Sequence, residues 1–183
     1  PYTPLFRSGA PASSPEGTLI SLGSTVSDPG VLDTHTYTWS VTKNGGVTPY
    51  ATGDAVSFSF TPDDDGTYVV SLMATDKDGG AGTDTRTITV LNVAPVLEAG
   101  VDATIDEGST FSGGGWFTDP GAETWTATVD YGDGSGVQAL TLNADKTFAL
   151  SHLYADDGVY TVAVTVTDDD GGIGTDTLLV KVN

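Results

Sequence analysis

The sequence predicts an all-β fold of two immunoglobulin-like antiparallel β-sandwiches in tandem, and two observations lead to it. Apolar and polar residues alternate with a period of two, as in the stretch Tyr160-Thr161-Val162-Ala163-Val164, and helical periodicity is absent. Residues 64–85 also recur 92 positions later, with 14 of the 22 aligned positions identical. A self-match of this kind means that one structural module occurs twice.

The spacing of turn sequences gives the domain organisation. Each copy of roughly 90 residues holds about seven short alternating runs separated by Asp-Gly and Asn-Gly turns, which is typical of a sandwich. The joint is expected at the proline-containing segment of residues 92–95, so the first module covers residues 12–93 and the second covers residues 94–183. Residues 1–11 hold three prolines and have no match in the second copy, and we expect them to form an extended N-terminal arm.

A tyrosine in each copy sharpens the sandwich prediction. Tyr68 and Tyr160 each follow an Asp-Gly turn by two residues, at the start of an alternating run. This is the arrangement of a tyrosine corner, in which the phenol hydroxyl bonds back to the preceding turn. Both tyrosines are therefore predicted to have a structural role.

The composition restricts the partners. The chain has 25 acidic and only 6 basic residues, a formal net charge of -19, so it repels nucleic acid and anionic membrane surfaces and attracts divalent cations or basic partners. It has no cysteine, which excludes disulfides and cysteine metal sites. No stretch approaches the roughly 20 apolar residues that cross a bilayer, so membrane insertion is not expected.

The second copy resembles the PKD (polycystic kidney disease) domain family. The resemblance lies in Val129-Asp130-Tyr131-Gly132-Asp133-Gly134-Ser135, followed by His152-Leu153-Tyr154 and Gly158-Val159-Tyr160-Thr161-Val162. The first copy lacks the acidic hairpin and the His-x-Tyr step, so it is a divergent PKD-like module. The resemblance implies immunoglobulin-like sandwiches, strung in tandem in large bacterial surface or secreted proteins and used for spacing, adhesion or matrix building.

Acidic residues in the loops are the candidate metal ligands. In a sandwich of this topology, loops from both modules are expected to face the linker, bringing together Asp63, Asp64, Asp65, Asp119, Glu123, Asp168 and Asp170. Calcium takes six to eight oxygen ligands of this kind. We therefore expect calcium to bind at the junction and stiffen the pair. The alternative is that the Asp-Gly turns are ordinary hairpin chemistry and that their acids only keep the molecule soluble.

No residues of the chain predict catalysis. The acids lie in solvated turns, no nucleophile elbow or phosphate loop is present, and His152 is interpreted as a hydrogen-bonded structural residue. Trp39 and Trp125 are expected in the cores. Trp116 is expected to point outward beside three glycines and is the candidate partner-binding residue, although single exposed apolar residues are common.

The leading interpretation is a non-catalytic structural or adhesion spacer of an extracellular or cell-surface bacterial protein, stiffened by calcium. Its partners would be other domains of the same large protein or copies of itself. The first alternative is a carbohydrate- or matrix-binding accessory region of a secreted hydrolase. The second is a subunit of a self-assembling filament or surface layer that polymerises through the N-terminal arm.

Overall fold

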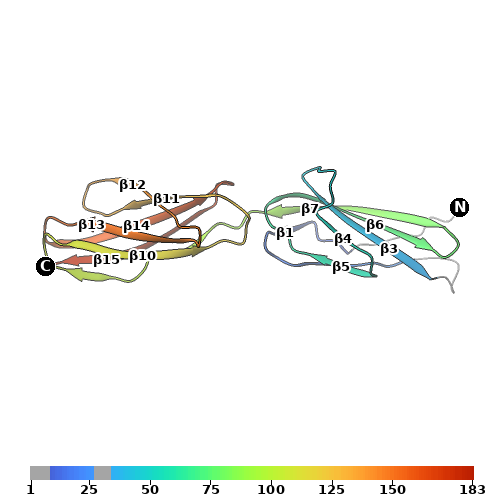
Figure 1. The fold of residues 1–183 in the computed structure, drawn as a ribbon, viewed down its shortest axis with the longest axis horizontal. Helices are drawn as coiled ribbons and strands as arrows, with labels where there is room; N and C mark the ends of the chain where they lie inside the picture. Colours follow the sequence, from blue (N-terminus) through green and yellow to red (C-terminus); the bar gives the residue numbers. More distant parts are fainter. Residues whose placement is uncertain (1–8, 27–33) are drawn as a thin grey trace. The chain divides into compact units, whose positions relative to one another are not determined.

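A computed structural model describes residues 9–26 and 34–183, and all regular secondary structure in these ranges is β-strand. The chain divides into two compact units, Pro1–Asn92 and Val93–Asn183, one residue before the predicted joint (Figure 1). Most of the predicted N-terminal arm, residues 1–8, lies outside the described residues. Each unit is a sandwich of two sheets.

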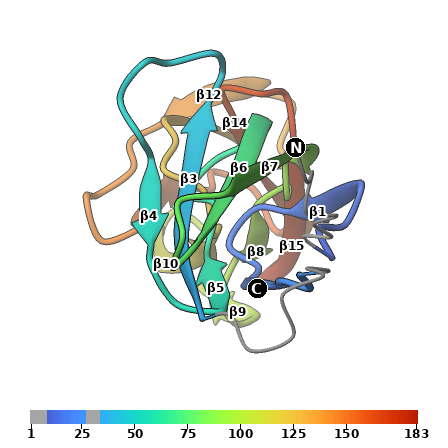
Figure 2. The same cartoon turned by 90° about the vertical axis from the view of Figure 1, so that its right-hand side faces the viewer.

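In the first unit, one sheet has the order β1-β7-β6-β3-β4 and the other pairs β2 with β5. Figure 2 shows the order of the larger sheet from β4 across to β1. β1 runs parallel to β7, and the other pairs are antiparallel. The strands are β1 (Ser13–Pro15), β2 (Ile20–Gly23), β3 (His35–Lys43), β4 (Ala51–Gly53), β5 (Ser57–Phe60), β6 (Gly66–Asp76) and β7 (Ala81–Leu91).

In the second unit, the sheets have the orders β12-β11-β14-β15-β9 and β13-β10-β8. The first stretch of the unit is divided between the sheets, because β8 pairs antiparallel with β10 whereas β9 pairs parallel with β15. The strands are β8 (Val96–Glu98), β9 (Ala103–Ile105), β10 (Thr110–Thr118), β11 (Trp125–Asp130), β12 (Val137–Leu140), β13 (Thr147–Leu153), β14 (Gly158–Asp168) and β15 (Ile173–Val182).

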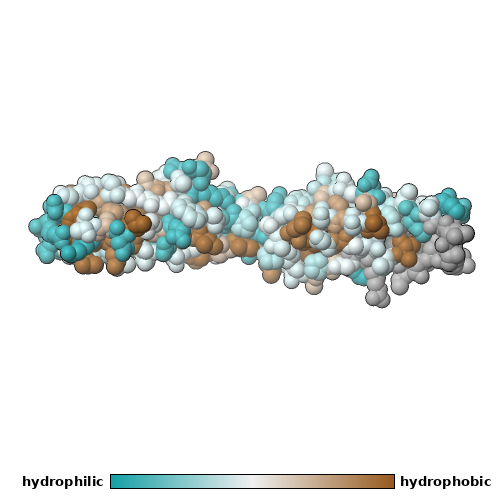
Figure 3. All heavy atoms as spheres, turned by 90° about the horizontal axis from the view of Figure 1, so that it is seen from below, coloured by the Kyte–Doolittle hydropathy of each residue, from teal (hydrophilic) through white to brown (hydrophobic). Residues whose placement is uncertain are grey.

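Strand alternation places a separate core in each unit. On β6, Tyr68, Val70 and Leu72 are buried while the residues between them face outward, as the period of two requires. Trp39 is fully buried in the first core, where its ring stacks on Phe58 at 5.8 Å between centroids. On the face shown in Figure 3, hydrophobic residues form small groups separated by polar ones in both units.

The two core tryptophans predicted from the sequence do not occupy equivalent places. Trp39 faces Leu72 across the sheet, whereas Trp125 faces Asp168 at the end of its strand. Val129 takes the central place in the second unit, since it pairs with Val164, the counterpart of Leu72. Trp125 is accordingly only half-buried, at the rim of the core.

Both predicted tyrosine corners have the expected hydrogen bond. The Tyr68 hydroxyl donates to the carbonyl of Asp64 at 2.9 Å, and the Tyr160 hydroxyl donates to the carbonyl of Asp156 at 3.0 Å. Each bond ties the start of a long central strand to the turn that precedes it. The corner therefore fixes the loop as well as the strand.

Candidate functional site

Three acidic side chains of the second unit converge where two strands end. Asp119 follows β10, Glu123 lies in the loop to β11, and Asp168 is the last residue of β14. Each contributes a carboxylate oxygen to a group in which all three oxygens lie within 4.8 Å of one another. Asp119 and Asp168 are only 8% and 5% exposed. Three carboxylates this close repel one another, and burial strengthens the repulsion.

Neighbouring donors compensate part of this charge. The indole Nε1 of Trp125 donates to Oδ2 of Asp119 at 3.2 Å, and the backbone N–H of Gly121 donates to Oδ1 at 2.8 Å. The ammonium of Lys146 donates to the Asp119 carbonyl at 2.8 Å and lies 4.2 Å from the centroid of the Trp125 ring. One basic residue thus reaches the cluster, from the turn between β12 and β13.

The donor set suits a hard cation. Carboxylate oxygens are the ligands that calcium prefers, and each oxygen has two lone pairs, so an oxygen that accepts a hydrogen bond can also bind a metal. The three side chains could supply at least three of the six to eight oxygens that calcium takes, with the remainder from carbonyls or water. Asp119, Glu123 and Asp168 are therefore the residues that would hold it.

Asp168 is also a turn-forming residue. Its Oδ1 accepts hydrogen bonds from the N–H groups of Asp170 at 3.1 Å and Gly172 at 2.6 Å. Asp76 does the same in the first unit, where Asp78 and Gly80 donate to its Oδ1 at 2.8 Å. The repeated Asp-x-Asp-Gly sequence thus forms one turn twice, as the turn alternative predicts. Asp170 itself is exposed in this turn.

The candidate acids of the first unit surround a lysine. The Lys43 ammonium donates to Asp64 at 2.7 Å and to Asp63 at 3.2 Å, while the Tyr68 hydroxyl donates to Asp63 at 3.1 Å. Burial disfavours the charged ammonium, but the bonds to the two carboxylates outweigh it and raise the pKa of Lys43. Burial would likewise raise the pKa of Asp63, and the pairing with Lys43 lowers it. Asp65 lies beside this group, half-exposed.

The acidic hairpin of the second unit is a structural element. Asp130 accepts a hydrogen bond from the Gly132 N–H at 2.9 Å, and Asp133 accepts one from the Ser135 N–H at 3.0 Å. Asp133 also lies 2.7 Å from Nε2 of His152, on the neighbouring β13. Hydrogen bonds from Ser135, and then from His152, hold the pKa of Asp133 well below its usual range.

Aromatic rings complete this link between the hairpin and β13. His152 stacks on Tyr131 with centroids 4.2 Å apart and meets the edge of Tyr154. The Tyr154 hydroxyl donates to the Tyr131 carbonyl at 2.9 Å, and burial raises the pKa of Tyr154 to about 12. His152 therefore has hydrogen-bonding and packing partners on the hairpin, as expected of a structural histidine.

Trp116 lies on the outer face of the sheet β13-β10-β8 and is 48% exposed. Its cross-strand neighbours are Thr147 and Glu98. Two residues away on the same face, Gly114 lies opposite Ala149, so this neighbouring cross-strand pair has little side-chain bulk. The indole is thus an exposed aromatic group on the face of a sheet, with a hydroxyl residue and a carboxylate residue opposite it on the two neighbouring strands.

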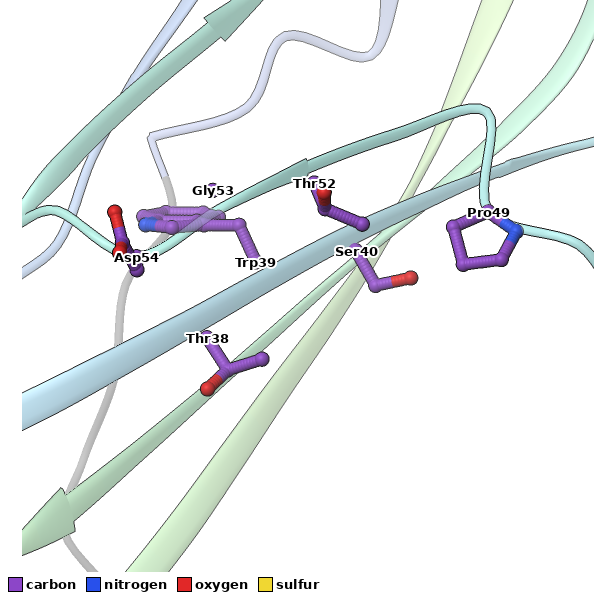
Figure 4. Close-up of a pocket in the computed structure, with 7 residues that line it drawn as sticks. All are labelled: Thr38, Trp39, Ser40, Pro49, Thr52, Gly53 and Asp54. Carbon is purple, nitrogen blue, oxygen red and sulfur yellow. The ribbon is translucent and has the colours of Figure 1, made fainter.

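A shallow hollow of about 560 Å³ lies over β3 and β4 of the first unit. Figure 4 shows its lining, in which Thr38 and Ser40 lie on the opposite side of β3 from the Trp39 ring. Thr52 and Asp54 complete the polar groups. One carboxylate with three hydroxyls, and no histidine or lysine in the lining, does not form a nucleophile–base pair.

These features define the class of the protein: tandem immunoglobulin-like sandwiches, each with a tyrosine corner. Two PKD-domain families match it in succession, "K319L-like, PKD domain" over residues 12–90 and "PKD domain" over residues 92–182. The chain therefore belongs to the PKD-domain family, with two consecutive domains. Domains of this family are in general non-catalytic structural or adhesion modules and typically occur in extracellular proteins.

Solved structures with similar folds are immunoglobulin- and fibronectin-like. The fibronectin(III)-like modules of CbhA from Clostridium thermocellum are 16% identical, with 99% of this chain and 94% of that chain covered and a TM-score of 0.37. The titin domains Z1Z2 in complex with telethonin are 16% identical over 99% and 95%, with a TM-score of 0.44. No curated protein matches the chain. Within the described ranges, no helix is long and apolar enough to cross a membrane.

Proposed function

We propose that this chain is a non-catalytic spacer or adhesion segment of an extracellular bacterial protein. The observation that carries the proposal is the succession of two PKD domains over residues 12–182, each with its own core and tyrosine corner. Repeated independent modules extend a protein by a fixed length per copy. The hydrogen-bonded loop acids and the hollow over β3 and β4 support a structural role, since neither contains a nucleophile–base pair.

Calcium bound by Asp119, Glu123 and Asp168 is the second part of the proposal. Asp119 and Asp168 are buried, Glu123 is half-buried, and the carboxylate oxygens of the three lie within 4.8 Å of one another. The second unit contains 15 acidic and two basic residues, hence a formal net charge of -13. The Asp168 turn also packs on the start of the unit, because a Cβ on Gly172 would meet the Ala94 Cα at 2.9 Å. An ion that orders this turn would therefore stiffen the segment that follows the domain boundary.

Calcium is expected to raise the melting temperature of the second unit. Binding at a free concentration 100 times the dissociation constant adds about 2.7 kcal/mol to the free energy of unfolding, which corresponds to roughly ten degrees or more for a domain of this size. The measurement is calorimetry in calcium and in chelator, with X-ray scattering to follow stiffening. Asp168→Asn should abolish the shift. Its matched control is Asp76→Asn, which alters the equivalent turn of the first unit.

Identical melting curves and scattering profiles in calcium and chelator would refute the calcium proposal. A shift that survives Asp168→Asn but disappears in Asp76→Asn would place the ion elsewhere. Neither result affects the spacer role, because each unit has its own apolar core.

A second candidate function is binding of a neutral polysaccharide through Trp116. The exposed indole beside Gly114 and Ala149 can stack on the apolar face of a sugar ring, while Glu98 and Thr147 can accept hydrogen bonds from its hydroxyls. Titration with cello- and chito-oligosaccharides should show an affinity that Trp116→Ala lowers by about tenfold or more. Val137→Ala, which trims an exposed apolar residue on the other sheet, is the control. A pure spacer shows no affinity in any variant.

A further inference from the structure

β12 (Val137–Leu140) is the terminal strand of the larger sheet in the second unit. It pairs with β11 on one side, and Figure 1 shows it at the margin of the sandwich. The backbone N–H and C=O groups on the other side of a terminal strand point away from the sheet. They can pair with a further strand unless something prevents its approach.

β12 has four residues and lacks two of the usual protections of an edge strand, charged side chains and proline. The eleven residues 134–144 contain no charged side chain and no proline, and Val137 is 68% exposed. The corresponding edge of the first unit is protected by proline and charge, since β4 lies between Pro49 and Asp54. Short length, proline and charge are the features that keep edge strands from pairing.

The charge distribution singles out the same side of the unit. Residues 134–154 contain one acidic and one basic residue, Asp145 and Lys146, and so have no formal net charge, in a unit whose formal net charge is -13. This segment contains both β12 and β13, the terminal strands at one side of the two sheets. Acidic residues are concentrated instead in the loops and on the other strands.

We infer that β12 pairs antiparallel with β12 of a second copy of this chain, making one continuous sheet across a two-fold axis. The charge distribution favours a second copy as the occupant. Two strongly acidic units repel each other, and the repulsion is least where both present a side with no net charge. A basic partner would be drawn to the acidic loops rather than to this edge. The inference goes beyond the spacer role and does not depend on calcium.

The register of β12 fits this pairing. Val137 and Ala139 face outward, because they lie opposite Asp130 and Thr128, while Leu140 packs toward the core. Antiparallel pairing that sets Gln138 opposite itself places Val137 of each copy beside Ala139 of the other. Outer-face residues then meet outer-face residues, as a continuous sheet requires.

The experiment is sedimentation equilibrium of the full chain from micromolar to millimolar concentration, at low and high salt. A reversible dimer is expected, and salt should strengthen it because it screens the repulsion between acidic units. Ala139→Lys should weaken dimerisation by about tenfold or more. The matched control is Thr52→Lys, which makes the same change of charge at an outward position of β4 and should leave the dimer intact.

Hydrogen exchange identifies the surface directly. The amides of β12 that point away from β11 should exchange more slowly in concentrated than in dilute wild-type protein, and this difference should vanish in Ala139→Lys. A wild-type protein that stays monomeric at about 1 mM would overturn the inference, because this concentration is well above the dissociation constants of ordinary specific complexes. A dimer that persists in Ala139→Lys, or that high salt dissociates, would also overturn it.

Discussion

Gly115→Ala is expected to lower the free energy of unfolding of the second unit by about 3 kcal/mol. A Cβ at this position would collide with the carbonyl oxygen of Glu98 on β8 and would approach the ring of Phe148 to 2.6 Å. The carbonyl belongs to a paired backbone, so it cannot move aside without breaking the ladder between β8 and β10. The Phe148 ring is buried and has little room to turn.

Gly113→Ala is the matched control for this substitution. Its Cβ would meet the tip of the Phe111 ring at 2.7 Å, and no backbone atom of another strand is among its nearest neighbours. A side chain can move aside more easily than a hydrogen-bonded strand. We therefore expect Gly113→Ala to lower the free energy of unfolding by clearly less than Gly115→Ala. The free energy of unfolding of both variants is measured by urea titration, with hydrogen exchange in peptides from each unit as the readout. If both variants lost the same free energy of unfolding, the contact of the Gly115 Cβ position with the β8 backbone would not be what makes Gly115→Ala unfavourable.

Trp39→Ala is expected to lower the free energy of unfolding of the first unit by about 3–5 kcal/mol, because it empties the largest site in its core. The side chain is fully buried, stacks on Phe58, and its Nε1 donates to the Ala55 carbonyl at 2.9 Å. The change removes packing and leaves that carbonyl without its indole donor. The second unit, which has its own core, should keep its stability.

The comparison for Trp39→Ala is Trp116→Ala in the second unit. Trp116 is half-exposed, so its removal should change stability by roughly 0.5 kcal/mol or less. Denaturant unfolding with fluorescence and hydrogen exchange resolved by unit distinguishes the two. If Trp39→Ala destabilised both units equally, the cores would not be independent.

The sequence was sufficient for the fold and for part of the site. Alternation on β6 and β14 determines which residues are buried, because a period of two leaves only one face for the core. The tyrosine corners depend on residues four apart in the chain, so their pattern is local and visible in the sequence. The proximity of Asp119, Glu123 and Asp168 followed from topology, since the loops of adjacent strands share one end of a sandwich.

Contacts made by long side chains could not be predicted in the same way. Lys43 reaches Asp63 and Asp64 from β3, and Lys146 reaches Asp119 across 27 positions of sequence. Neither lysine belongs to a motif, and the direction of a flexible side chain depends on packing that the sequence does not display. The sequence predicted that Trp125 faces the core, but not that it lies at the rim. Alternation shows which face of the sheet a side chain is on, whereas its burial also depends on how far along the strand it lies.

The parallel pairing at the margin of each unit has a mechanical consequence. In the second unit the incoming strand β9 lies beside the outgoing strand β15, through the pairs Ala103–Val180 to Ile105–Val182, and the two run in the same direction. In the first unit β1 and β7 are related in the same way. Tension applied to the two ends of a unit pulls these neighbours in opposite directions along their length. The hydrogen bonds of the pair are then sheared together rather than peeled apart in turn, so each module resists stretching until the whole pair gives way at once.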